Sequence, residues 1–363
     1  MRILILSWRC LKNPDSGGSE LYFHELSKRW AKNGHEIVWF SPQFSGGLRE
    51  EYCDGIKIIR KGNRFSVYLH SFLKYVKNDF GNFDVIIDVE NGIPFFSPLY
   101  IKKGEIFLHI QHIHKNVWVK EMPIHLAIIG KFLESVIMPL IYKKNKIITI
   151  SNSSFEEIKN DKLSNNDVYI VNPGIEFYKF KKYKKNKKAT VLFLNRIKKY
   201  KGIMHLLMAA KELKNQNIDF WIVGSGEYLD KAVDYAKREK LNNVIFFGKV
   251  DEERKKEIMQ KSWILVNPSY KEGWGIVNIE ANYFGIPVIG SNVSGIKDSV
   301  IDRRTGLLFE YGNHKELANK INFLVDNYKE RKYMGKEAKI WAKKFDWDSK
   351  AMEYLKILEK FKN

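Results

Sequence analysis

Short apolar runs alternate with longer amphipathic stretches along the whole chain, a pattern typical of parallel β-sheets whose strands are joined by helices. In the first half, strands are predicted at residues 3–6, 36–40, 85–88, 106–110, 147–150 and 169–171, with a helix at 21–32. In the second half, strands are predicted at 190–194, 220–223, 244–247, 264–266 and 287–289. This α/β pattern, repeated in both halves, predicts two Rossmann-like domains with parallel sheets.

The chain length supports two domains. Its 363 residues exceed what one hydrophobic core usually organises, and an apolar fraction of 44% is enough for two cores. We predict a first domain at residues 1–171 and a second at 172–348. Amphipathic helices at 315–327 and 349–361 close the chain.

One apolar stretch, residues 122–142, is long enough to resemble a membrane span. Lys131 and Glu134 near its middle would each cost about 2.5–3.5 kcal/mol at a bilayer centre, and Pro139 interrupts it. We therefore predict a helix packed in the first domain. The alternative is an interfacial surface or one that meets an acceptor lipid.

The net charge of +20 is unevenly distributed. Through Val171 there are 23 basic and 18 acidic residues (+5), and beyond it 39 and 24 (+15). Seven lysines lie between Lys179 and Lys188, interleaved with Phe180 and Tyr183. This predicts either a solvated surface segment or contact with an anionic membrane or another polyanion. Nucleic acid is not expected as a partner, since no helix-turn-helix, zinc-finger or RNA-binding aromatic signature is present.

The cysteines and the N-terminal run bear on localisation. Cys10 and Cys53 are too few for a disulfide framework, and the apolar run at residues 1–6 meets Ser7 and Trp8 instead of a signal-peptide cleavage region. A cytoplasmic protein is expected, with association at the inner face of the membrane as the alternative.

A glycine-rich bend at residues 271–280 (KEGWGIVNIE) carries the most informative chemistry. It follows a predicted buried strand and precedes a predicted helix at 276–284, so it lies at a strand's carboxyl end. Gly273 and Gly275 allow close approach to a ligand, and the helix start favours an anion such as a diphosphate. Glu272 and Glu280 can bracket a bound molecule and accept hydrogen bonds from sugar hydroxyls. The pattern indicates a nucleotide sugar.

Four segments in this order, 16–20 (SGGSE), 195–202 (NRIKKYKG), 224–226 (GSG) and 271–280, resemble the retaining glycosyltransferases of family 4, also called glycosyl transferases group 1. The resemblance implies the two-domain GT-B fold, with the sheets facing across a cleft and residues 349–363 crossing back onto the first domain. It places Glu272 at the donor sugar's hydroxyls and Glu280 at the ribose. Arg196 and Lys201 would contact the diphosphate, and Trp274 belongs to the same donor-binding bend.

Arg196 and Lys201 suit the chemistry of sugar transfer. Negative charge grows on the departing diphosphate, and a bidentate guanidinium with a mobile ammonium would stabilise it in place of a metal ion. The alternative is two surface cations in a basic protein. Gly17 and Gly18 precede a helix and would bring backbone N–H groups to the diphosphate, or form only a turn.

The remaining glycine pair, Gly224 and Gly226, predicts a tight strand-to-helix connection, with ligand contact as a secondary interpretation.

Three histidines, His109, His112 and His114, lie at the end of the predicted strand 106–110. A zinc site is disfavoured because His109 and His112 would face opposite sides of a continuing strand, and no carboxylate or cysteine follows at ligand spacing. By resemblance, His112 reaches the sugar and acceptor; otherwise it is structural.

Residues 346–348 (DWD) look like a metal-binding acidic triplet, but they lie late in the chain, before the final helix. An aromatic anchor, Trp347, with a helix-capping acid is the better account. No metal is predicted at any site.

Together these features predict a retaining, metal-independent hexosyltransferase that needs no cofactor. It would move a sugar from a UDP- or GDP-type donor to a glycan or lipid-linked acceptor in polysaccharide assembly. By resemblance we favour same-face attack, with a β-phosphate oxygen taking the acceptor's proton. The alternatives are a GT-B epimerase or phosphorylase, or a non-catalytic protein that binds a polyanion or a membrane.

Overall fold

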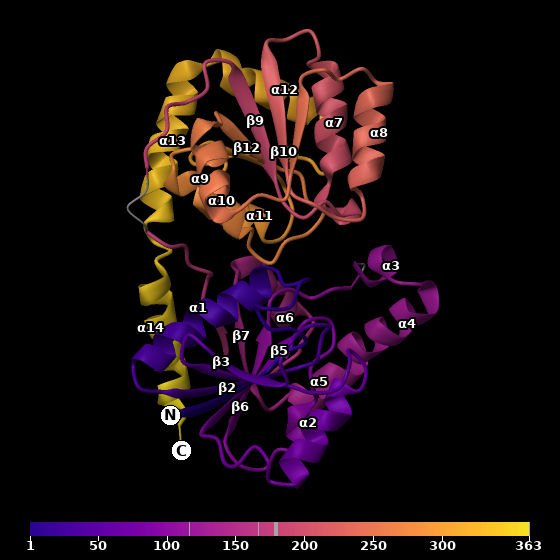
Figure 1. Ribbon diagram of the computed structural model, residues 1–363, viewed down its shortest axis with the longest axis vertical. Coiled ribbons are helices and arrows are strands. Elements are labelled where there is room, and N and C mark those ends of the chain that lie inside the picture. Colours follow the sequence, from indigo (N-terminus) through magenta and orange to yellow (C-terminus); the bar gives the residue numbers. More distant parts are fainter. Residues whose placement is uncertain (116, 166, 178–180, 363) are drawn as a thin grey trace. The chain divides into compact units, whose positions relative to one another are not determined.

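The computed structural model describes residues 1–115, 117–165, 167–177 and 181–362. The chain divides into two compact domains (Figure 1). The first comprises Met1–Gly174 with Asp346–Asn363, and the second comprises Ile175–Phe345. The final helix α14 (Trp347–Lys360) thus belongs to the first domain, as expected, and each domain boundary lies three residues from its predicted place.

The first domain is built on an eight-stranded sheet of order β3-β4-β2-β1-β5-β6-β7-β8. All neighbours are parallel except the edge pair β3 and β4, so the predicted parallel sheet is confirmed with one antiparallel edge strand that was not predicted. The order reverses between β1 and β5, and ligands of open α/β sheets bind at such a reversal. The strands are β1 (Arg2–Leu6), β2 (Glu36–Ser41), β3 (Glu50–Cys53), β4 (Ile56–Arg60), β5 (Val85–Glu90), β6 (Glu105–Ile110), β7 (Lys146–Thr149) and β8 (Val168–Ile170).

Helices α1 and α14 pack on each other in the first domain, where the indole Nε1 of Trp30 donates to the carbonyl of Ala351 (2.9 Å). Helix α1 begins at Gly18, three residues before the predicted start, so the loop at 16–20 is shorter than expected. The other helices of this domain are α2 (Val67–Val76), η1 (Ser97–Leu99), α3 (Val117–Glu121), α4 (Ile124–Phe132), the π-helical η2 (Leu133–Ile137), α5 (Met138–Tyr142) and α6 (Asn152–Asn160), and α1 spans Gly18–Lys32.

The continuous helix formed by α4, η2 and α5 covers most of the apolar stretch at residues 122–142. It packs on the first domain as predicted, since Met138 and Tyr142 belong to a core cluster with Leu108 and Ile110. Within the described residues, Ile124–Tyr142 is also the one helix whose length and composition would allow it to cross a membrane, and only 22% of its most apolar window is buried. Many of its apolar side chains therefore lie outside the core.

The second domain has a six-stranded parallel sheet of order β11-β10-β9-β12-β13-β14. The order reverses between β9 and β12, which places the loops after these two strands at a second ligand-binding reversal. Strand β14 was not predicted. The strands are β9 (Ala189–Leu194), β10 (Ile218–Val223), β11 (Val244–Gly248), β12 (Ile264–Asn267), β13 (Val288–Ser291) and β14 (Gly306–Phe309).

Helices cover both faces of the second sheet (Figure 1). One core contains residues of α7 (Ile203–Glu212), α8 (Leu229–Arg238) and α12 (His314–Asp326). The other contains residues of α9 (Glu252–Lys261), α10 (Ile276–Tyr283) and α11 (Ile296–Ser299). Helix α13 (Tyr328–Ala342), which was not predicted, packs against α10, and the short η3 (Lys199–Lys201) follows β9.

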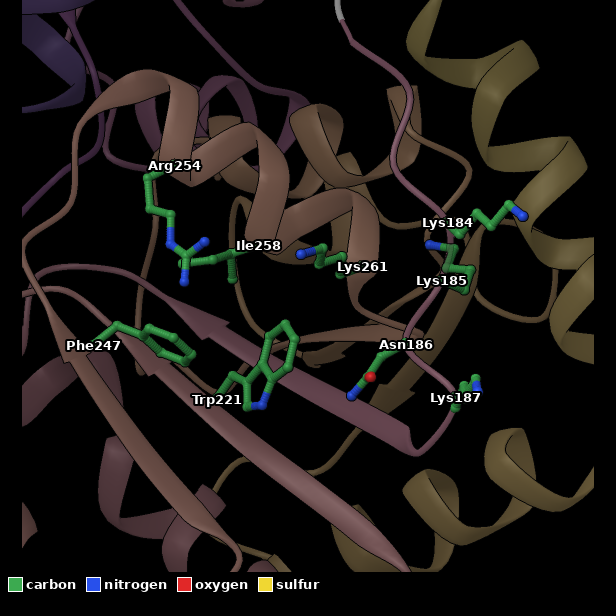
Figure 2. Close-up of a pocket in the computed structure, with 9 residues that line it drawn as sticks. All are labelled: Lys184, Lys185, Asn186, Lys187, Trp221, Phe247, Arg254, Ile258 and Lys261. Carbon is green, nitrogen blue, oxygen red and sulfur yellow. The ribbon is translucent and has the colours of Figure 1, made fainter.

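The lysine-rich segment is described from residue 181; Lys179 and Phe180 lie outside the described residues. The remainder is a surface segment, but it is held against the second domain rather than freely solvated. The Lys185 ammonium donates to the carbonyl of Ser262 (2.6 Å), and Lys188 pairs with Asp219 (2.6 Å). Residues 184–187 form one wall of an open pocket of about 530 Å³ (Figure 2).

Candidate functional site

Lys201 and Glu272 meet at the carboxyl edge of the second sheet, between β9 and β12. Lys201 ends η3, which follows β9, and Glu272 lies in the bend after β12. The Lys201 Nζ is 2.6 Å from Glu272 Oε1, and the two side chains are only 7% and 13% exposed. The strand reversal thus brings together a cation and a carboxylate that are 71 residues apart in sequence.

Two further donors converge on Glu272 Oε1. The hydroxyl of Ser269 lies 2.9 Å away and the amide Nδ2 of Asn195 3.4 Å away. Sequence reasoning missed both residues, although Asn195 follows directly after β9 and Ser269 lies two residues after β12, the two strands that form the reversal. Their position after apolar strands is the signal that could have identified them.

A chain of hydrogen bonds between buried polar side chains stabilises the bend at residues 271–280. Asn267 Nδ2 donates to Asn278 Oδ1 (3.0 Å), and Asn278 Nδ2 donates to Ser299 Oγ (2.9 Å). These bonds tie the end of β12 to the first turn of α10 and to α11. Gly275, with φ +83°, provides the left-handed turn from which α10 starts.

The glycine turn after β10 supports the loop that carries Arg196. A Cβ on Gly224 would lie 1.9 Å from the carbonyl of Asn195, and one on Gly226 would lie 2.4 Å from that of Ile197. The predicted tight connection is confirmed. Contact of these glycines with a ligand remains a prediction.

Arg196 is exposed, and its guanidinium has no hydrogen bond or ion pair with the described residues. Its backbone N–H donates to Asn195 Oδ1 (2.9 Å), which fixes the loop while the side chain stays available. A guanidinium with all its donors in solvent is suited to bind an anion bidentately.

Glu280 lies on α10 and pairs with Lys255 of α9 at 3.0 Å. Lys255 also contacts Glu252 (2.8 Å). Burial by itself would lower the pKa of Lys255, but the two carboxylates outweigh it and raise that pKa. Glu280 is thus oriented by a lysine that sequence reasoning missed, and no contact joins it to the Lys201–Glu272 pair within the described chain.

The side chain of Trp274 does not fit a ligand-contacting role. It is 4% exposed and its ring packs edge-to-face on Phe345, with centroids 5.1 Å apart. Contact of the Trp274 backbone with the donor remains a prediction, but the indole itself is buried. It anchors the bend to the interior of the second domain, while its neighbours Gly273 and Glu272 are partly exposed.

Gly17 and Gly18 lie where predicted, after β1 and at the start of α1, beside the strand reversal of the first domain. Gly17 has extended backbone with φ −145°, and its N–H donates to Glu20 Oε2 (2.7 Å). Glu20 is buried, so the helix start is fixed from inside. Diphosphate contact by these glycines remains a prediction.

The histidines divide into different environments. His109 lies in β6, is fully buried and is within hydrogen-bond distance of Tyr354 (3.2 Å); burial lowers its pKa to about 3, so it is structural. His112 is partly exposed in the following loop, and its ring centroid lies 4.6 Å from that of His114. A role for His112 at the sugar remains a prediction.

His114 lies between two buried carboxylates. Its Nδ1 is 3.3 Å from Glu90 and 3.7 Å from Glu134. Burial alone would lower the pKa of His114, but the two carboxylates raise it to about 10. Sequence reasoning saw no carboxylate near the histidines because Glu90 ends β5 and Glu134 lies in η2, both distant along the chain.

Two groups of side chains in the described residues are spaced closely enough to hold a metal ion, with ligand atoms within 4.8 Å of one another. One is Glu90, His114 and Glu134, and the other is His24, Cys53 and Asp54. In the first group, the charge pairs around His114 account for the clustering without a metal. Absence of a metal requirement therefore stays a prediction.

The triplet at 346–348 has the structural role that was expected. Asp346 caps α14 by accepting from the N–H of Ser349 (2.9 Å), and Trp347 is buried. Asp348 pairs with Arg29 of α1. The residues anchor the final helix on the first domain.

The pocket in Figure 2 is separate from this chemistry. Its lining includes Trp221, Phe247, Arg254 and Lys261 together with the lysine-rich segment. It shares no lining residue with the Lys201–Glu272 pair.

Comparison with known proteins identifies the family. Residues 16–177 match Glycosyltransferase Family 4, and residues 174–341 match Glycosyl transferases group 1. An uncharacterized glycosyltransferase of Methanocaldococcus jannaschii is 30% identical over 96% of both chains. The N,N'-diacetylbacillosaminyl-diphospho-undecaprenol alpha-1,3-N-acetylgalactosaminyltransferase of Campylobacter jejuni is 28% identical over 60% of both. The solved structure of Anabaena HepE in complex with UDP and glucose covers 99% of this chain and 100% of its own, with a TM-score of 0.74 and 17% identity. The chain belongs to the family 4 glycosyltransferases and has their GT-B fold.

Proposed function

We propose that this glycosyltransferase moves a hexose from a nucleoside diphosphate sugar to a glycan or lipid-linked acceptor, with retention of configuration and without a metal ion. The observation that carries the proposal is the Lys201–Glu272 pair at the strand reversal, 2.6 Å apart and largely shielded from water. Such a pair beside the exposed guanidinium of Arg196 offers both a carboxylate for sugar hydroxyls and cations for a diphosphate.

In this proposal the cationic side chains bind the diphosphate and the carboxylates bind the sugar and the ribose. Arg196 and Lys201 stabilise the negative charge that develops on the departing diphosphate, a task that a metal ion performs in other transferases. Glu272 accepts hydrogen bonds from the donor sugar, and its fixed orientation by Ser269 and Asn195 limits the sugar to one position. Glu280, held by Lys255, accepts from the ribose.

The proposed step is a same-face displacement. The acceptor hydroxyl oxygen bonds to the anomeric carbon as the bond from that carbon to the diphosphate oxygen breaks. The acceptor proton passes to a β-phosphate oxygen of the leaving group, so no protein nucleophile is needed. Glu272 positions the donor in this scheme, and His112 lies on the acceptor side.

The donor and acceptor classes rest on similarity. The HepE structure contains UDP and glucose, and the Campylobacter relative is named for a diphospho-undecaprenol acceptor. A UDP- or GDP-type donor and a saccharide acceptor, free or carried on a lipid, follow for this chain. We propose a cytoplasmic location, with association at the inner face of the membrane as the alternative.

The test is thermal stabilisation by a panel of nucleoside diphosphates and their sugars, with and without EDTA. A ligand held a hundredfold above its Kd stabilises the folded state by about 2.7 kcal/mol. We expect one nucleotide to raise the melting temperature, with no effect of EDTA.

Variants locate the binding site. R196A and E280A should lose the shift, whereas the matched control R238A, whose side chain is 70% exposed at the end of α8, should keep it. A folded protein that responds to no nucleotide would refute the donor-dependent enzyme and favour the non-catalytic polyanion-binding alternative.

A further inference from the structure

The first domain exposes a continuous apolar surface made by three segments: α2, η1 and the helix Ile124–Tyr142. Its exposed side chains include Leu69 and Val76 on α2, Leu99 on η1, and Ile124, Ile128 and Leu140 on the long helix. The segments adjoin one another because η1 packs on α5, and Tyr100, directly after η1, contacts Phe72 of α2 with ring centroids 5.7 Å apart. We call this surface the apolar face; Figure 1 shows where α2, α4 and α5 lie in the first domain.

The long helix is apolar on its outward face as well as on its buried one. Its buried positions include Ala127, Glu134, Met138 and Tyr142, yet Ile128 and Leu140 are 64% and 70% exposed. A soluble helix normally turns its large aliphatic side chains to the core and its small or polar ones to water. Packing within the domain therefore does not explain why these large aliphatic side chains face outward.

The helix is nevertheless fixed to the domain, which excludes a transmembrane arrangement. The buried carboxylate of Glu134 accepts from the backbone N–H of Lys115 (2.8 Å) and the indole of Trp118 (3.1 Å). The hydroxyl of Tyr142 donates to the buried carboxylate of Asp88. Leaving the domain would expose these groups to hydrocarbon without partners, at a cost of several kcal/mol each.

The segments that form the apolar face are predominantly basic. Across residues 65–78, 97–104 and 122–145 the sequence has seven lysines and one acidic residue, the buried Glu134. The lysines are Lys74, Lys77, Lys102, Lys103, Lys131, Lys143 and Lys144. Long lysine side chains can extend their ammonium groups to lipid phosphates while their aliphatic stems lie along apolar surface. Segments that combine exposed aliphatic side chains with lysines complement an anionic lipid surface in both polarity and charge.

We propose that the apolar face binds peripherally to an anionic lipid bilayer. The aliphatic side chains of α2, η1 and the long helix enter the acyl boundary, and the lysines contact the lipid phosphates. The contact lies in the first domain and not in the lysine-rich segment of the second, where Lys185 and Lys188 are engaged with protein groups. It does not depend on the proposed donor chemistry, because none of its residues belongs to the nucleotide-sugar site.

The test is flotation of the full chain with vesicles of phosphatidylcholine alone or with about one third phosphatidylglycerol. The native chain should float with the anionic vesicles and should bind at least tenfold more weakly to the neutral ones or at high salt. I128S/L140S should reduce binding at least tenfold. The matched control F323S/I340S, which replaces two exposed apolar side chains of the second domain, should bind as the native chain does.

Two other variants and one other measurement complete the test. K102E/K103E should weaken binding to anionic vesicles, whereas K181E/K182E in the lysine-rich segment should not. Failure of the native chain to float, or equal flotation of I128S/L140S, overturns the proposal. A dimer in light scattering that I128S/L140S converts to a monomer would also overturn it, by showing that a second copy covers the face. Thermal stabilisation by the nucleotide should be unchanged in I128S/L140S, so failure here is distinct from failure of the proposed activity.

Discussion

At the residue scale, the Lys201–Glu272 pair combines a structural and a chemical role. Each side chain gives up most of its hydration, which the other offsets by a 2.6 Å contact. Removing one partner of such a pair is costly because the remaining charge stays shielded from water, whereas removing both charges is tolerated much better. This asymmetry separates the contribution of the pair to folding from its contribution to chemistry.

We therefore predict that K201M lowers the free energy of unfolding by about 1–3 kcal/mol, because Glu272 loses its nearest cation. Turnover of the donor should fall by about 100-fold or more, as charge on the leaving diphosphate loses a stabilising group. Urea unfolding and initial rates measure the two effects.

The double variant K201M/E272Q provides the control. Stability should largely return, since no unpaired carboxylate remains, while activity should not. Recovery of activity together with stability would show that the pair serves only the fold.

His114 supports a prediction about pH. Its folded-state pKa is raised to about 10, above the ordinary value of 6.5, by Glu90 and Glu134 acting against burial. Its contribution to stability is complete below pH 6.5 and is lost as the pH rises through about 10, because only the folded state holds the proton in that interval. The expected decline in free energy of unfolding is at most about 1.4 kcal/mol per pH unit.

Chemical unfolding at pH 7, 8 and 9 measures this slope. H114Q/E134Q, which removes one charge of each sign, should show a smaller decline than the native chain. Parallel declines in the two proteins would mean that His114 is neutral in the folded state.

Sequence singled out the residues proposed to contact a ligand more readily than the residues that orient them. Glu272, Lys201 and Arg196 stood out because their spacing matches a family pattern. Lys255 and Glu90 did not, because their partners come from other elements, and such pairing depends on tertiary packing. The burial of the Trp274 indole was not predicted either, since a motif gives position along the chain but not the direction of the side chain.

At the scale of elements, the turn into α7 positions Lys201. Gly202 has φ +73°, and a Cβ there would lie 1.9 Å from the carbonyl of Pro268, at the end of β12. We predict that G202A lowers stability by more than about 1 kcal/mol and also lowers activity, because η3 must move away from the bend. Thermal melts and initial rates measure both changes.

Gly312 offers a matched control for this prediction. It also has a positive φ, +93°, but nothing lies within 4 Å of a Cβ placed there. G312A should show only backbone strain and full activity per folded molecule. Equal effects of the two substitutions would show that close packing at Gly202 has no importance for the site.

Elements with strong apolar patterns were predictable, and those with mixed patterns were not. The central strands of both sheets are buried on both faces, so their apolar runs were clear. Strand β3 lies at an exposed edge and begins with Glu50 and Glu51, and α13 carries many charges, so neither showed a distinct pattern. The helix Ile124–Tyr142 was recognised and packs on the first domain as predicted, but its exposed apolar side chains were not foreseen, because composition does not show which side chains of a uniformly apolar helix face outward.

At the scale of the whole molecule, the first domain is completed by the chain's final segment. Tyr354 of α14 is fully buried, packs on Trp30 of α1 with centroids 5.3 Å apart, and lies 3.2 Å from the ring nitrogen of His109. Residues at opposite ends of the sequence therefore share one core. The stability of the first domain then depends on a helix that follows the entire second domain in the chain.

We predict that Y354A destabilises the first domain by about 3–5 kcal/mol, the usual cost of truncating a buried aromatic side chain. Amide hydrogen exchange should accelerate in β1, β6 and α1, whereas β9 and β12 should keep native protection, because the side chains on which Tyr354 packs, Tyr22, Phe23, Trp30 and His109, belong to the first domain. Y333A is the matched control, since Tyr333 on α13 is 52% exposed and its loss should leave both domains unchanged. Accelerated exchange in β9 and β12 of Y354A would show that the two domains unfold as one cooperative unit, and would contradict the assignment of α14 to the first domain alone.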